Sequence, residues 1–137
     1  MKITEKDINE TVSGDEETFV FEMLDGISGS QKEKAFRILY NILHTDSEPY
    51  SVIGAIVSQF ELMLSVRQLL DNGMDIKEIY KKLGGSEFRI KKMIPYANRF
   101  SEEKLKSILS SIYEVDRKIK NGLLGPQTAL ELFIAGI

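Results

Sequence analysis

The basic residues that follow a two-glycine turn are the side chains of this sequence best suited to holding a charged ligand. Residues 75–94 read as two short amphipathic helices joined at Gly84-Gly85, and the second helix carries Arg89, Lys91 and Lys92. This pattern is typical of a helix-turn-helix, whose basic side chains would contact DNA phosphates with an affinity that falls as salt rises. Any helical bundle with a tight turn produces the same pattern, so a purely structural role is the other interpretation.

The other residue types that perform chemistry are isolated from one another. The chain has no cysteine and a single histidine, His44, which excludes thiol nucleophiles, zinc-finger ligand sets and histidine pairs. Residues 71–75 resemble the start of a calcium loop, but Lys82 stands where the bidentate glutamate is needed. Adjacent acids such as Glu102 and Glu103 point in different directions on a helix, and no P-loop is present. We therefore expect no catalytic residue, no cofactor, no metal and no small-molecule substrate, and we expect His44 to lie at a helix end.

The elements that must position these residues are helices. Apolar residues recur three and four positions apart, as in Leu105, Ile108, Leu109 and Ile112, and glycines fall between such runs. Residues 18–24 are rich enough in aromatic and β-branched types for a strand, but no second strand is available to pair with them. The sequence predicts an all-α helical bundle without a sheet, with helices at 4–12, 18–27, 30–44, 48–72, 75–83, 86–99, 101–120 and 126–136.

Several single residues mark the expected helix ends. Pro49 and Pro126 stand where a first helical turn begins, Ser101 is a candidate N-cap, and Gly84 is a candidate C-cap. Pro95 lies well inside an expected helix, where it removes one backbone hydrogen bond. We expect a kink or a break at that proline.

Composition places the chain among ordinary globular domains. It has 137 residues, 42% of them hydrophobic and 28% charged, with a net charge of −3. The charge is uneven, since residues 1–31 carry two basic and eight acidic residues and residues 77–120 carry twelve basic and six acidic ones. No apolar run approaches the roughly 18 residues of a membrane span, and no signal-peptide core appears. We expect a cytoplasmic protein with no membrane partner.

The expected helix at 48–72 is apolar around much of its circumference. Such a helix is either central in a bundle or shared with a partner, and both interpretations remain open. The same holds for the tyrosines, which suit an interface rim and the edge of a core equally well. They are Tyr40, Tyr50, Tyr80, Tyr96 and Tyr113.

A series of short motifs follows one another along the chain. They are Ile3-Thr4 with Asp7-Ile8 and Val12, Lys34 to Leu39 with Leu43, Ser58 to Leu64, Leu83-Gly84-Gly85 with Phe88 and Lys91-Lys92, Asp116 to Gly122, and Ala129 to Leu132. In this order and spacing they resemble the C-terminal part of the delta subunit of bacterial DNA polymerase III, a component of the sliding-clamp loader. The resemblance covers essentially the whole chain.

This resemblance implies a domain organisation. Residues 18–137 would form the helical collar domain, and residues 1–17 would be the last helix and linker of a preceding ATPase-like module that binds no nucleotide. Met1 would then begin a piece of a longer protein. The collars of the family's subunits pack in a ring, so this piece would mediate assembly of the clamp-loader pentamer.

The resemblance also implies partners and candidate residues. The partners would be the collar domains of the other clamp-loader subunits, with DNA reached through the assembled complex. Gln59, Phe60, Asp116 and Lys120 carry the resemblance and are the candidate interface residues. The family supplies no catalytic residue, although its parent complex is a DNA-directed DNA polymerase, a nucleotidyltransferase. The helix-turn-helix with Arg89, Lys91 and Lys92 is the alternative function.

Overall fold

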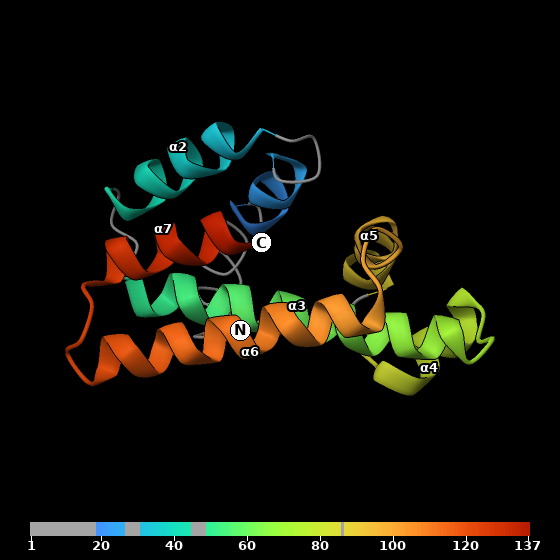
Figure 1. The fold of residues 1–137 in the computed structure, drawn as a ribbon. Helices are drawn as coiled ribbons and strands as arrows, with labels where there is room; N and C mark the ends of the chain where they lie inside the picture. The colour runs from blue at the N-terminus through green and yellow to red at the C-terminus, as the bar shows by residue number, and fades with distance from the viewer. Residues whose placement is uncertain (1–18, 27–30, 45–48, 86) are drawn as a thin grey trace, which may run out of the picture. The chain divides into compact units, whose positions relative to one another are not determined.

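The computed structural model describes residues 19–26, 31–44, 49–85 and 87–137, and within these ranges the regular elements are helices without any strand (Figure 1). Residues 19–26 are helical and are followed by α2 (Lys32–Leu43), α3 (Pro49–Asp71), α4 (Ile76–Leu83), α5 (Glu87–Ala97), α6 (Glu102–Lys120) and α7 (Pro126–Gly136). The predicted all-α class is confirmed. The helix expected at 4–12 and the separate segment expected at 1–17 lie outside the described residues.

The expected helix ends are confirmed by local geometry. Pro49 and Pro126 are the first residues of α3 and α7, where the missing N–H has no helical partner. Ser101 caps α6, since its Oγ accepts a hydrogen bond from the Lys104 backbone N–H at 3.0 Å. Gly84 ends α4 with a φ of 70°, a conformation that glycine adopts without the steric cost of a Cβ.

Of the two outcomes predicted at Pro95, a kink or a break, the break is absent. Helix α5 continues through Pro95 and ends two residues later, at Ala97. Both Pro95 and Lys91, whose carbonyl loses its helical partner, are exposed, so water can satisfy that carbonyl. The proline therefore costs α5 one hydrogen bond without ending it.

The fold packs as two compact units, and the division falls inside α3 and α6. The first comprises the described residues up to Val57 together with Ser111–Ile137, and we call it the α2–α7 unit. The second comprises Ser58–Ser110, and we call it the α4–α5 unit.

The α2–α7 unit is built on the packing of α2 alongside α7 (Figure 1). The Lys32 Nζ donates to the Ala135 carbonyl oxygen at 2.8 Å, which joins the start of α2 to the end of α7. The helix at 19–26 is buried on almost every side, which explains why its sequence lacks an alternation of apolar and polar residues. The core side chains of this unit include Val20, Met23, Leu24, Leu39, Val52, Ile56, Ile112, Leu130 and Phe133.

The α4–α5 unit has its own apolar core. Helix α4 packs on α5, and each contributes buried side chains, such as Ile79 from α4 and Met93 from α5. The C-terminal part of α3 and the N-terminal part of α6 supply the rest, including Phe60, Met63, Val66, Leu105 and Ile108.

Helix α3 is long and apolar enough to cross a membrane by length and composition alone, contrary to the expectation that no apolar run reached that length. Its buried side chains Val52, Ile56, Phe60 and Met63 recur at helical spacing and lie in the cores of the two units. Its C-terminal part carries Arg67, which is engaged in hydrogen bonds within the α4–α5 unit. These contacts favour a core helix of a globular fold.

Candidate interaction surfaces

Two of the four candidate interface residues lie inside the fold. Gln59 is 1% exposed and Phe60 is 0% exposed, both in the α4–α5 unit. The Oε1 of Gln59 is buried without a hydrogen-bond partner, which is costly for a polar atom away from water. Neither side chain is presented on the surface of the unit, so Phe60 contributes to core packing.

The other two candidates form an ion pair on the surface of the α2–α7 unit. The Lys120 Nζ donates to the Asp116 Oδ2 at 2.8 Å, one helical turn apart on α6. This hydrogen bond raises the pKa of Lys120 above its usual range, so the ammonium stays charged. Surface pairs of this kind contribute little to folding, which leaves both charges available to a partner.

Two half-exposed tyrosines belong to the same unit as this ion pair. Tyr113 lies three and seven residues before Asp116 and Lys120, and therefore on the same face of α6. Tyr50, near the start of α3, adds to the rise in the pKa of Lys120 after the larger effect of Asp116. We call Tyr50, Tyr113, Asp116 and Lys120 the α6 surface.

The three basic residues of the predicted helix-turn-helix do not share one surface. The turn has the expected geometry, with positive φ at Gly84 and Gly85. Arg89 is half-buried, and its Nη2 donates to the Ser58 Oγ of α3 at 3.1 Å, so its guanidinium faces α3. Lys91 and Lys92 are exposed.

An exposed aromatic ring stands between these two lysines. Phe88 is 76% exposed, the largest exposed fraction among the large hydrophobic residues that the structure describes. It precedes Lys91 and Lys92 by three and four residues, so the three side chains share one face of α5. Phe88 was not among the predicted site residues, although its position on the lysine face of the helix was a visible signal.

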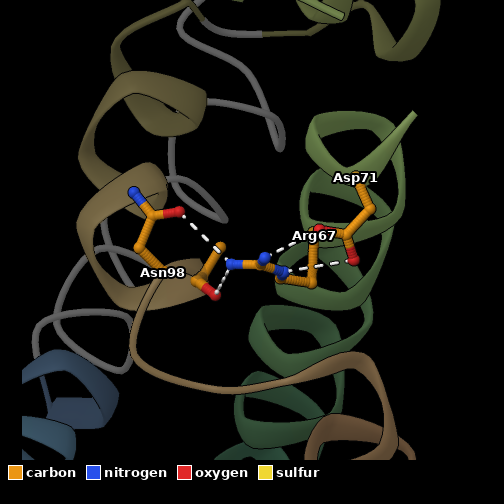
Figure 2. A network of polar contacts seen from close by, with 4 residues as sticks. Arg67, Asp71 and Asn98 are labelled. Atoms are coloured by element: carbon orange, nitrogen blue, oxygen red, sulfur yellow. Dashed lines mark hydrogen bonds and ion pairs between the residues drawn. The ribbon is translucent and has the colours of Figure 1, made fainter. Parts of the chain in front are cut away.

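Arg67 forms a polar network that was not predicted from the sequence either (Figure 2). Its Nε and Nη2 donate to the Asp71 carboxylate at 3.3 and 2.7 Å, and its Nη1 donates to the Ala97 carbonyl and the Asn98 Oδ1, both at 3.4 Å. The four-residue spacing from Arg67 to Asp71 was a sequence signal for the ion pair. The contacts with Ala97 and Asn98 arise only from tertiary packing.

His44 lies at the C-terminal end of α2, as predicted. Its Nδ1 lies 2.8 Å from the Tyr40 carbonyl oxygen, which can only accept, so Nδ1 carries the proton. The two rings stack with their centroids 3.8 Å apart. Among the described residues no three His, Cys, Asp or Glu side chains are grouped so that they could hold a metal ion.

Comparison with known proteins gives a consistent result. The profile of the family described as "DNA polymerase III delta subunit, C-terminal domain" matches residues 17–137. The DNA polymerase III subunit delta of Bacillus subtilis is 30% identical over 133 residues, which are 97% of this chain and 38% of that protein.

A solved structure agrees with the sequence match. The DNA clamp loader delta protein of Bacillus subtilis superposes with a TM-score of 0.82 at 30% identity, covering 88% of this chain and 36% of that one. The chain thus spans little more than a third of the length of both relatives. Since the family profile covers most of the sequence, the chain belongs to the family formed by the C-terminal domains of DNA polymerase III delta subunits.

Proposed function

We propose that this chain is the assembly domain of a clamp-loader delta subunit and that it binds the corresponding helical domains of other clamp-loader subunits through the α6 surface. The observation that supports this proposal is the set of side chains on the α6 surface. The half-exposed Tyr113 lies on the same face of α6 as the Asp116–Lys120 pair, and the half-exposed Tyr50 belongs to the same α2–α7 unit. Tyrosine supplies large contact area with a polar tip, and charged residues at the rim select the partner and fix its orientation.

The wider context of the proposal follows from the family. The domain would act in DNA replication, in the cytoplasm, within the DNA polymerase III assembly whose polymerase activity is a nucleotidyl transfer. This chain would contribute no catalytic group of its own. We further propose that residues 1–17 belong to the preceding module and that the collar begins near residue 18, a boundary supported by the start of the family match at residue 17.

The proposal is tested by light scattering on a sizing column. The chain is run alone and then mixed with the C-terminal domains of the other clamp-loader subunits. We expect a mixed peak heavier than either component. The test variant combines Asp116→Lys with Lys120→Asp, which keeps an ion pair within α6 but reverses the charges that a partner meets. We expect it to weaken the mixed complex by about tenfold or more.

A matched control exists on the same helix. Glu114 and Arg117 form another exposed ion pair, which lies on the other side of Tyr113 around the helix. The control variant combines Glu114→Arg with Arg117→Glu and reverses the charges of this pair. The control should leave the mixed peak unchanged. Absence of a mixed peak with the unaltered chain would contradict the assembly role, and equal weakening by both charge reversals would contradict the assignment to Asp116 and Lys120.

A further inference from the structure

Two helices of the chain are each followed by an asparagine and a glycine. Asn72-Gly73 comes directly after the last residue of α3, and Asn121-Gly122 directly after the last residue of α6. All four residues are exposed. Because glycine has no Cβ, its backbone nitrogen can approach the side-chain amide of the preceding asparagine without steric hindrance. Such a pair is therefore the place where an asparagine side chain reacts most readily with the backbone.

The two turns share one backbone geometry. The glycine has a φ of 83° after α3 and of 73° after α6. In both turns the glycine N–H donates to the carbonyl oxygen three residues before it at 3.0 Å, and the following N–H donates to the carbonyl oxygen five residues before it, at 3.1 and 2.9 Å. Hydrogen bonds at a helix end open more readily than those in its middle, so each glycine nitrogen is released by the same local opening. A difference in reactivity between the two asparagines must then come from their surroundings.

The excess charge beside Asn72 is negative. The neighbouring Asp71 is paired with Arg67, the Oδ1 lying 2.7 Å from Nη2, so these two charges offset each other. Asp75 follows three residues after Asn72, is exposed, and is the N-cap of α4. Its carboxylate gives this turn its excess of negative charge.

The excess charge beside Asn121 is positive. The Asn121 N–H donates to the Arg117 carbonyl oxygen at 3.0 Å, so helical geometry extends to this residue and places Lys118, three positions earlier, next to it. The other two basic residues in the last turn of α6 form ion pairs with acids of the same helix. Lys118, which is half-buried, therefore gives this turn a charge opposite to that beside Asn72.

We propose that Asn121 is a site of spontaneous deamidation, which does not depend on subunit assembly, and that it reacts faster than Asn72. The Gly122 nitrogen gives its proton to solvent and attacks the side-chain amide carbon of Asn121. A carbon–nitrogen bond forms and closes a succinimide ring, while the side-chain nitrogen takes up a proton and leaves as ammonia. Water then adds to either carbonyl carbon of the ring and opens it, which yields aspartate or isoaspartate. One water is consumed and one ammonia is released for each asparagine.

The charges beside the two pairs decide which asparagine reacts first. Negative charge develops on the glycine nitrogen and then on the oxygen of the tetrahedral intermediate, where a nearby cation stabilises it and a nearby anion opposes it. Lys118 therefore speeds the reaction at Asn121, and Asp75 slows the reaction at Asn72. Because both turns are open to solvent, added salt should screen these effects.

The test follows both asparagines in one sample of the full chain, incubated at mildly alkaline pH. A protease that cleaves after glutamate, used in mild acid, releases residues 62–78 and 115–131, each with a single Asn-Gly pair. Mass spectrometry of these fragments measures the conversion of amide to acid. At about 0.01 M salt we expect Asn121 to convert at least about threefold faster than Asn72. At about 1 M salt, where the Debye length is about 3 Å, the two rates should become equal.

Single substitutions assign the rate difference to charge. Lys118→Gln should slow conversion of Asn121 about twofold and leave conversion of Asn72 unchanged. Asp75→Ser keeps a capping oxygen for α4 and should speed conversion of Asn72 alone. As a matched control, Lys104→Gln removes an exposed charge from the first turn of α6 and should change neither rate.

Three results would overturn the proposal. The first is that Asn121 stays an amide in the folded chain while a synthetic peptide of residues 115–131 is converted, because the turn would then protect it. The second is conversion of Asn72 as fast as that of Asn121, or faster, at the lowest salt. The third is a rate difference that persists at high salt and in Lys118→Gln, which would show that charge is not its cause.

Discussion

Arg67 of α3 donates a hydrogen bond to the carbonyl oxygen of Ala97, the last residue of α5, over 3.4 Å. The other side of the same guanidinium holds the carboxylate of Asp71 in a bidentate pair (Figure 2). The last carbonyl groups of a helix have no hydrogen-bond donor within that helix. Arg67, on another helix, supplies a donor for one of them. The planar fork of arginine makes both contacts possible at once.

Replacing Arg67 with methionine should therefore destabilise the α4–α5 unit. We expect the free energy of unfolding to fall by about 1 to 2 kcal/mol, because a partly buried carbonyl and a carboxylate lose their donor. Arg67→Lys should recover only part of this loss, since an ammonium lacks the planar fork through which arginine reaches both groups. Urea denaturation followed by circular dichroism measures the effect. As a control, Arg117→Met removes an exposed ion pair with Glu114 and should cause no measurable change.

Asp75 should be the most sensitive single residue for the formation of α4. Its carboxylate accepts a hydrogen bond from the Glu78 backbone N–H at 2.9 Å, and the Glu78 carboxylate accepts one from the Asp75 N–H at 3.1 Å. Asp75→Ala should cost about 1 kcal/mol and speed hydrogen exchange of the first α4 amides. Asp75→Asn keeps an acceptor and should cost much less. Equal costs for the two variants would show that charge, rather than capping, is what matters at this position.

The helices of this chain were predictable because their signals are local. The spacing of Leu105, Ile108 and Ile112 identifies the buried face of α6, and Ser101 marks its start without reference to any other element. The Asp75–Glu78 capping box was equally local and could have been predicted from an aspartate followed three residues later by a glutamate. The continuation of α5 through Pro95 was not predictable locally, because exposure on a helix surface, which decides whether the orphaned carbonyl is solvated, is a tertiary property.

The candidate surfaces depended on information that the sequence does not contain. Helix α3 is apolar on several faces, so its sequence could not show that Gln59 and Phe60 point inward. In the sequence, Arg89 is a basic residue of the same helix as Lys91 and Lys92 and cannot be told apart from them as a candidate contact. Its hydrogen bond to Ser58, 31 residues away, arises from tertiary packing. Asp116 and Lys120 did lie on the surface, because a four-residue spacing is enough to place two charges together on a helix.

Glu102 gives the stability of the α4–α5 unit a dependence on pH. Hydrogen bonds from Lys106 and then from Gln68 of α3 lower the pKa of its carboxyl below the usual range. A carboxyl whose pKa is lower in the folded than in the unfolded state stabilises the fold at pH values above its unfolded-state pKa. This contribution is lost as the pH falls through its folded-state pKa. Glu102→Gln should therefore lower the urea midpoint at neutral pH and leave it unchanged in acid, below both pKa values.

The neighbouring acid provides the control for this experiment. Glu103→Gln removes the same charge from the first turn of α6, so both variants lose a similar interaction with the helix dipole. The bonds to Lys106 and Gln68 belong to Glu102. If Glu103→Gln lowered the neutral-pH midpoint as much as Glu102→Gln, the dipole rather than the bonds would account for the effect.

Gly26 and Gly54 should respond in opposite ways to the addition of one methyl group. A Cβ at Gly26 would lie 3.1 Å from the Gln31 carbonyl oxygen and 3.2 Å from the Ala35 nitrogen, both backbone atoms that cannot rotate away. Overpacking of this kind typically costs about 1 to 3 kcal/mol, which outweighs the gain in helix propensity. Gly26→Ala should therefore lower the free energy of unfolding.

At Gly54, inside α3, a Cβ would meet nothing within 4 Å, so only the helix propensity changes. Gly54→Ala should raise the free energy of unfolding by up to about 1 kcal/mol, because alanine loses less backbone entropy when a helix forms. Thermal and urea unfolding of the two variants beside the unaltered chain measures both effects. A loss of stability at Gly54 would mean that another surface packs closely against this position in solution, since nothing in the described part of the chain occupies that space.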